Sequence, residues 1–129
     1  MIITPLYAGL LALWFLALSA RVVQKRNTIS LGDGGDPEML RRIRGHGNFA
    51  EYVPLILLMI GFLEVSHFPA WLLHTLGATL LVSRLLHGYA LSFSPKFGFG
   101  RFWGTVLTFG LLAVCGLLCI YQAVTGSLA

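Results

Sequence analysis

The residues best suited to chemistry in this chain are arginines, which recur with an asparagine and a glutamate at helical spacing. Arg44, Asn48 and Glu51 follow one another at intervals of four and three residues. At about 100° per residue, these side chains fall within a sector of about 60° on a helix. We call these three residues the polar stripe. Guanidinium binds carboxylate bidentately and a carboxylate can pair with an ammonium group, so the stripe suits a zwitterionic ligand of peptide size.

The helix that carries the polar stripe is expected to cross a membrane. Only the twelve uncharged residues from Tyr52 to Leu63 separate Glu51 from Glu64. At about 1.5 Å per residue they cover about 18 Å of a hydrocarbon core about 30 Å thick. The helix must therefore include residues back to about Arg44, and an ionised group facing lipid there costs about 2.5–3.5 kcal/mol. The stripe should face protein or a wet cavity; an internal ion pair is the purely structural alternative.

Further basic groups should reach the same level from the other helices. The short connection from Ser66 to Pro69 makes the second and third spans antiparallel neighbours, which returns Arg84 and His87 to the level of the polar stripe. Arg21 and Arg101 arrive there from the first and fourth spans. Every expected helix thus contributes a basic group to one face of the membrane.

The positions of the apolar runs predict an all-α, integral membrane four-helix bundle that forms a single domain over residues 1–129. Hydrophobic residues make up 57% of the chain, too many for a soluble fold of this size. In the second span, Asp36 is expected to cap the helix and Pro37 to take its first position. Gly100 and Gly104 have a spacing that allows close helix approach, or that reflects no more than the high glycine content of membrane helices. The expected spans are Ile2 to Lys25, Pro37 to Val65, Pro69 to Phe93 and Phe99 to Gly126.

The basic residues also predict the orientation in the membrane. All nine Lys and Arg residues lie between Arg21 and Arg44 or between Arg84 and Arg101. By the positive-inside rule, the first and third connections should be cytoplasmic and both termini outside, in a bacterial inner membrane or the endoplasmic reticulum. The basic residues sit at span ends rather than in a continuous patch, so no nucleic-acid partner is expected.

The second span also resembles a known family. The stretch Arg44-Gly-His46-Gly-Asn48-Phe-Ala-Glu51-Tyr52-Val-Pro54 is similar to the second-helix signature Arg-x-His/Gln-x-Asn-x-x-Glu-x-x-Pro. That signature is typical of the membrane-associated proteins in eicosanoid and glutathione metabolism, the MAPEG family, and every fixed position agrees. Supporting matches are Ser19-Ala20-Arg21, Arg84-Leu-Leu-His87 and Arg101, so the resemblance covers essentially the whole chain.

The resemblance implies a homotrimer that binds glutathione as co-substrate between neighbouring subunits. Arg101 matches a fourth-helix arginine that steadies the thiolate in the prostaglandin-synthase branch, and is the catalytic candidate. Lowering a thiol pKa from about 8.5 by about two units requires about 2.7 kcal/mol, which a nearby guanidinium in a partly dry site can supply. The residues implied for glutathione binding are Arg21, Arg41, Arg44, Asn48, Glu51, Tyr52, Arg84 and His87.

These features favour a membrane glutathione transferase whose thiolate attacks a hydrophobic electrophile arriving from the lipid phase. The same thiolate would give peroxidase activity on lipid hydroperoxides. One alternative is a non-catalytic membrane protein that binds lipid or glutathione on the same scaffold. Another is a small proton or ion carrier that uses Glu51 and His87, although it leaves the arginines unexplained. No metal site is expected, because His46 points about 140–160° away from the polar stripe.

Overall fold

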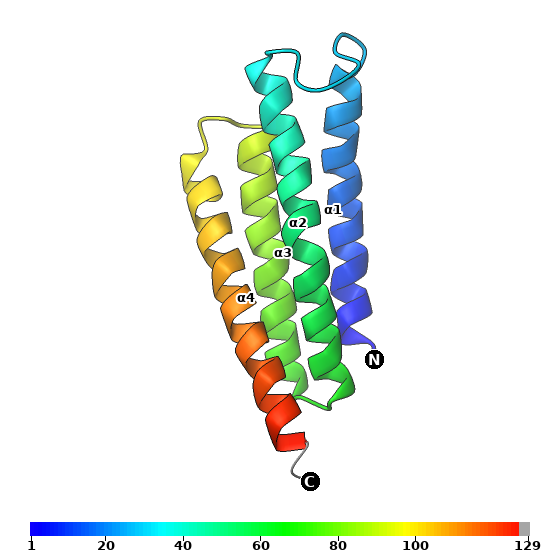
Figure 1. The fold of residues 1–129 in the computed structure, drawn as a ribbon, viewed down its shortest axis with the longest axis vertical. Coiled ribbons are helices and arrows are strands. Elements are labelled where there is room, and N and C mark those ends of the chain that lie inside the picture. The colour runs from blue at the N-terminus through cyan, green and yellow to red at the C-terminus, as the bar shows by residue number, and fades with distance from the viewer. Residues whose placement is uncertain (127–129) are drawn as a thin grey trace.

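The computed structural model describes residues 1–126, which form four α-helices and no strand (Figure 1). The all-α four-helix class is therefore confirmed. Each helix end lies within one residue of the predicted span. The helices are α1 (Ile3–Lys25), α2 (Pro37–Val65), α3 (Ala70–Ser92) and α4 (Gly98–Gly126).

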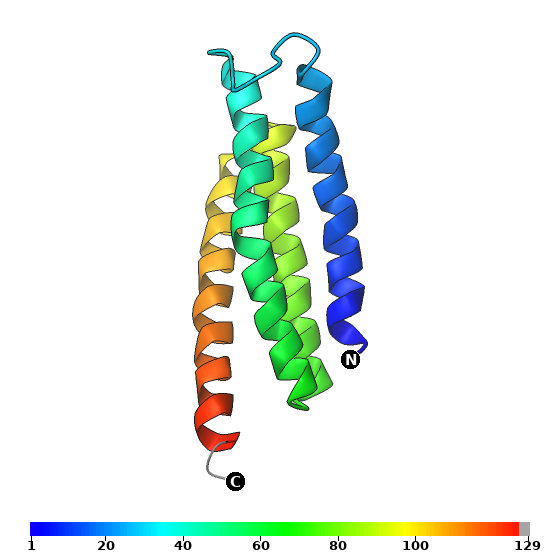
Figure 2. The ribbon, with the colours of Figure 1, turned by 45° about the vertical axis from the view of Figure 1, so that its right-hand side comes forward.

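Helix α3 is the centre of the bundle. It packs against α1, α2 and α4, and α2 also packs against α1 and α4. Within residues 1–126, α1 and α4 make no contact with each other, and Figure 2 shows them on opposite sides of the α2–α3 hairpin. The core between the helices includes Leu18, Ile56, Ile60 and Leu80, which are fully buried. The start of α1 and the end of α4 lie at one end of the bundle, and the long loop between α1 and α2 lies at the other (Figure 1).

The outer surface of the bundle is that of a membrane protein. Helices α1, α2 and α4 are long and apolar enough to cross a membrane. Large apolar side chains such as Leu13, Phe62 and Leu117 are more than half exposed on them, a surface that lipid accommodates and water does not. Helix α3 carries the more polar His74 and Arg84, but its 23 residues extend about 34 Å, which is compatible with its predicted role as a fourth span.

Helix α2 begins as its sequence predicts. The Oδ1 of Asp36 accepts hydrogen bonds from the backbone N–H groups of Glu38 and Met39 at 2.8 and 3.0 Å, and Pro37 occupies the first turn. Oδ2 of Asp36 pairs with Nζ of Lys25 at 3.1 Å. The N–H of Met39 and then the ammonium of Lys25 are the main groups that lower the pKa of the Asp36 carboxyl below its usual 3.8. The cap therefore also connects the end of α1 to the start of α2.

The opposite end of α2 is hydrogen-bonded to the beginning of α1. The carboxylate of Glu64 accepts hydrogen bonds from the backbone N–H groups of Ile2, Ile3 and Thr4 at 2.5, 2.7 and 2.7 Å. These donors have no partner within their own helix, and a negative charge is favourable at a helix N-terminus. The side chain at the end of α2 thus acts as the cap of α1.

Candidate functional site

A cavity of about 240 Å³ opens among α2, α3 and α4 near the end of the bundle that holds the long loop. Three helices contribute side chains to it, and most of those side chains are cationic or polar. Five of the nine predicted site residues line the cavity: Arg41, Arg44, Asn48, His87 and Arg101. Two apolar side chains, Leu40 and Leu91, complete the lining.

The polar stripe reaches the edge of this cavity. Arg44 and Asn48 lie one helical turn apart and both line it. Nη1 of Arg44 lies 3.4 Å from Oε1 of Glu51, so the ion pair that the spacing allowed is present. Both side chains are about half exposed, at 54% and 51%, and such an exposed pair contributes little to stability. The cavity lies beside this ion pair. Arg44 lines the cavity, whereas Glu51 lies next to it rather than in its wall.

Two other predicted residues of this region are turned toward protein. Arg84 is only 2% exposed and lies behind Asn48, to which its Nη1 donates a hydrogen bond at 2.7 Å. The ring of Tyr52 packs against that of Phe109 in α4, with centroids 5.7 Å apart. Neither Arg84 nor Tyr52 lines the cavity.

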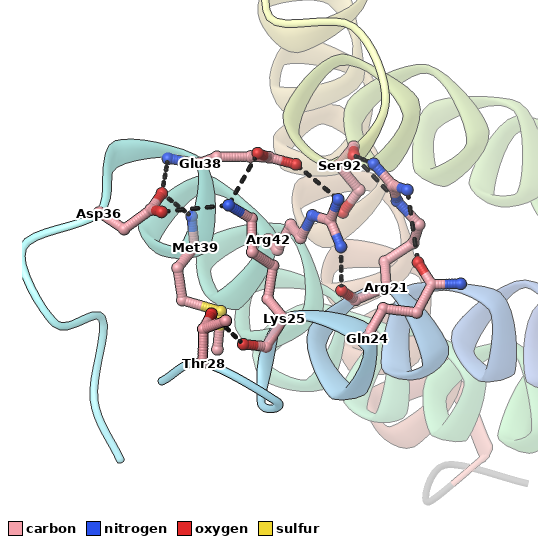
Figure 3. Close-up of polar contacts among 9 residues, drawn as sticks. All are labelled: Arg21, Gln24, Lys25, Thr28, Asp36, Glu38, Met39, Arg42 and Ser92. Atoms are coloured by element: carbon pink, nitrogen blue, oxygen red, sulfur yellow. Dashed lines mark hydrogen bonds and ion pairs between the residues drawn. The ribbon is translucent and has the colours of Figure 1, made fainter. Parts of the chain in front are cut away.

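Arg21 is placed elsewhere by the structure. Its Nε and Nη2 donate to the backbone oxygen of Ser92 at 3.2 and 2.7 Å (Figure 3). Its guanidinium also lies 4.6 Å from the ring centroid of Phe93. These contacts fasten the end of α1 to the end of α3. Arg21 does not line the cavity, and its predicted contact with glutathione stays a prediction.

Sequence reasoning missed the role of Arg42, which is buried next to this contact. Its Nη1 donates to the backbone oxygen of Arg21 at 2.6 Å, and its Nη2 pairs with Oε1 of Glu38 at 2.5 Å (Figure 3). The other oxygen of Glu38 lies 3.0 Å from Nζ of Lys25. The spacing of four residues between Glu38 and Arg42 signals a helical ion pair, but the contact with Arg21 depends on tertiary packing. We call Lys25, Asp36, Glu38 and Arg42 the helix-end network.

An apolar groove adjoins the cavity along α4. It has a volume of about 440 Å³ and is lined by Gly98, Arg101, Phe102, Thr105, Val106 and Phe109. Arg101 belongs to both linings. A single guanidinium therefore stands between a cationic cavity and a surface suited to an apolar molecule.

Comparison with known proteins agrees with this architecture. The model of the MAPEG family matches residues 4–121. This chain is a member of the MAPEG family. Among MAPEG relatives, it is 38% identical over 89 residues to the inner membrane protein YecN of Escherichia coli strain K12, a match that covers 67% of this chain and 68% of YecN. YecN from Escherichia coli O6:H1 matches to the same extent. No solved structure matches the chain significantly.

Proposed function

We propose that this MAPEG protein is a membrane-bound glutathione transferase, an activity characteristic of its family. The observation that carries the proposal is the cavity itself. Three guanidinium groups, an asparagine and a histidine meet there, contributed by three helices. Glutathione has two carboxylates that guanidinium groups bind well, and an ammonium group with which Glu51 can pair at the edge of the cavity.

In this proposal, Arg101 acts on the sulfur of glutathione. It lines both the cationic cavity and the apolar groove, so a thiolate held beside it would face an electrophile in the groove. The guanidinium stabilises the thiolate, and the thiol proton is released to water. The thiolate then forms a carbon–sulfur bond with the electrophilic carbon, and the leaving group departs as an anion. Binding both reactants side by side contributes the remaining rate enhancement.

A second subunit would complete this site. The cavity of about 240 Å³ is smaller than the about 300–1,000 Å³ typical of sites for small molecules. Arg44 and Glu51 are half exposed at its edge, where the side chains of a neighbouring subunit would enclose a bound ligand. These features support the homotrimer that the family resemblance implies, with Arg21, Glu51 and Tyr52 acting at or near the subunit interface.

The orientation follows from the positions of the basic residues. At one end of the bundle α1 and α3 end and α2 and α4 begin (Figure 1). The residues of the cavity and of the helix-end network belong to this end. The positive-inside rule assigns this end to the cytoplasm, where glutathione is available, and both termini to the outer side. The inner membrane location of YecN supports a bacterial inner membrane for this chain as well.

The proposal is tested with protein purified in detergent. Isothermal titration should show glutathione binding that weakens at least tenfold in Arg44→Ala and in Glu51→Gln, while Lys96→Gln leaves the affinity unchanged. Consumption of thiol with an aryl halide should follow the same order. Failure of folded, assembled wild-type protein to bind glutathione would overturn the proposal.

A non-catalytic binding protein on the same scaffold is the second candidate. It is favoured by the apolar lining of the groove between α1 and α2, which includes Leu11, Phe15, Val53 and Leu57 and has room for a lipid chain at about 310 Å³. Binding of lipid or glutathione without any loss of thiol in the presence of electrophiles or lipid hydroperoxides would establish this alternative.

A further inference from the structure

Arg84 is a buried cation whose partners are all neutral. Besides Asn48, its Nη2 donates to the backbone oxygen of Gly104 at 3.0 Å and to Oγ1 of Thr108, and its Nε lies 3.5 Å from Oγ of Ser83. Within residues 1–126, no carboxylate pairs with Arg84. A buried guanidinium is costly unless its donors are satisfied. These hydrogen bonds hold it in one position against α2 and α4.

This position determines how Asn48 is presented to the cavity. A guanidinium has five N–H donors and no acceptor, so only the carboxamide oxygen of Asn48 can face it. The hydrogen bond of 2.7 Å from Nη1 of Arg84 is consistent with that orientation. The carboxamide NH₂ of Asn48 must then point away from Arg84. In the part of the chain that the structure describes, this NH₂ donates no hydrogen bond, and Asn48 belongs to the wall of the cavity.

We infer that Arg84 is a positioning residue that turns the NH₂ donors of Asn48 toward the ligand. The inference rests on the proposed function, and it identifies the ligand group at Asn48 as a hydrogen-bond acceptor, namely a carboxylate of glutathione. That carboxylate lies between Asn48 and the guanidinium of Arg44, which lines the same cavity. Arg84 therefore acts through Asn48 and makes no contact with glutathione, in contrast to the direct contact that the family resemblance implies.

A substitution at Asn48 tests the role of the carboxamide NH₂ group separately from that of the carboxamide oxygen. Asn48→Asp keeps an oxygen for Arg84 and adds a buried ion pair, but it removes both N–H donors. The variant should assemble normally and retain its helical content, and its affinity for glutathione should fall at least tenfold. The Michaelis constant for glutathione should change by a larger factor than turnover at saturating glutathione. Unchanged affinity in Asn48→Asp would overturn the inference.

A double-mutant cycle shows whether Arg84 acts through Asn48. Arg84→Met should weaken glutathione binding in the wild-type background and have no further effect in an Asn48→Ala background. A direct contact between Arg84 and glutathione would instead lower affinity by the same factor in both backgrounds and would overturn the inference. If Arg84→Met does not assemble, Arg84→Gln carries the same comparison, because a glutamine carboxamide has both a donor and an acceptor and no longer dictates which side of Asn48 faces it. Arg26→Met in the first loop is the control for loss of one positive charge.

These outcomes distinguish the inference from the proposed function. Additive effects in a wild-type protein that binds glutathione overturn the role of Arg84 alone. Absence of glutathione binding in assembled wild-type protein overturns the proposed function and this inference together.

Discussion

Gly104 of α4 lies directly against His87 of α3. A Cβ atom at position 104 would come within 2.6 Å of the Cβ of His87 and 2.7 Å of the backbone oxygen of Ser83. The two helices therefore approach so closely that only glycine fits. Arg101 precedes Gly104 by three residues and lies on the same face of α4, so this contact also sets the position of Arg101 beside the cavity.

Gly104→Ala should separate α3 from α4. Overpacking of this kind costs about 1–3 kcal/mol, and the shift should also weaken glutathione binding by moving Arg101 and Asn48 apart. Gly110→Ala in the same helix is the matched control, because nothing lies within 4 Å of a Cβ at that position. Thermal unfolding in detergent, followed by circular dichroism, measures both variants. Equal midpoints for the two would contradict the assigned packing.

The fold follows from the sequence because the spans are long and their boundaries are marked by Asp36, Pro37 and the Ser66 to Pro69 connection. The presence of a polar site at this level is also predictable from the sequence, since helical spacing and the hairpin bring Arg44, Asn48 and His87 to one level. Within that level the sequence does not fix the direction of each side chain. Arg21 and Arg84 turn to backbone oxygens and an amide of neighbouring helices, because those partners depend on helix rotation.

Arg101→Gln should change the acidity of bound glutathione. Without the guanidinium, the pKa of the thiol should return to its ordinary value of about 8.5, so a shift of about two units means that the thiolate fraction well below neutral pH falls about a hundredfold, and conjugation falls with it. Lys96→Gln, in the adjacent loop, controls for the loss of a positive charge. The measurement is the dependence of turnover on pH, supported by ultraviolet absorbance of the thiolate. A profile identical to that of wild type would remove Arg101 from catalysis.

The neighbouring residues Arg41 and Arg42 should have opposite effects. Arg41 lines the cavity, so Arg41→Ala should weaken glutathione binding and leave stability nearly unchanged. Arg42 is 7% exposed and makes charged hydrogen bonds to Glu38 and the Arg21 carbonyl. Arg42→Ala should therefore cost about 1.5–3 kcal/mol. Calorimetry with glutathione and thermal unfolding of both variants check this pair, and loss of stability in Arg41→Ala alone would reverse the assignment.

The stability that Asp36 contributes should depend on pH. Its carboxyl has a lower pKa in the folded protein than its usual 3.8, so folding stabilises the ionised carboxylate relative to the protonated form. The contribution is fully present above that usual value and is lost as pH falls through the folded pKa. Asp36→Asn keeps a capping oxygen but loses the charge facing Lys25. Its unfolding midpoint should lie below that of wild type at neutral pH and converge on it in acid, whereas a constant difference down to pH about 3 would contradict this account.

Helix α1 is clamped to α2 at both of its ends, through Glu64 at its beginning and through Arg42 at its finish. Its register in the bundle is thus set by contacts between helices rather than by the chain that joins them. The linker of residues 26–36 is consequently free to vary in length. Residues inserted near Gly32 should leave the cavity intact, which makes this turn a suitable place for a fluorescent or affinity tag.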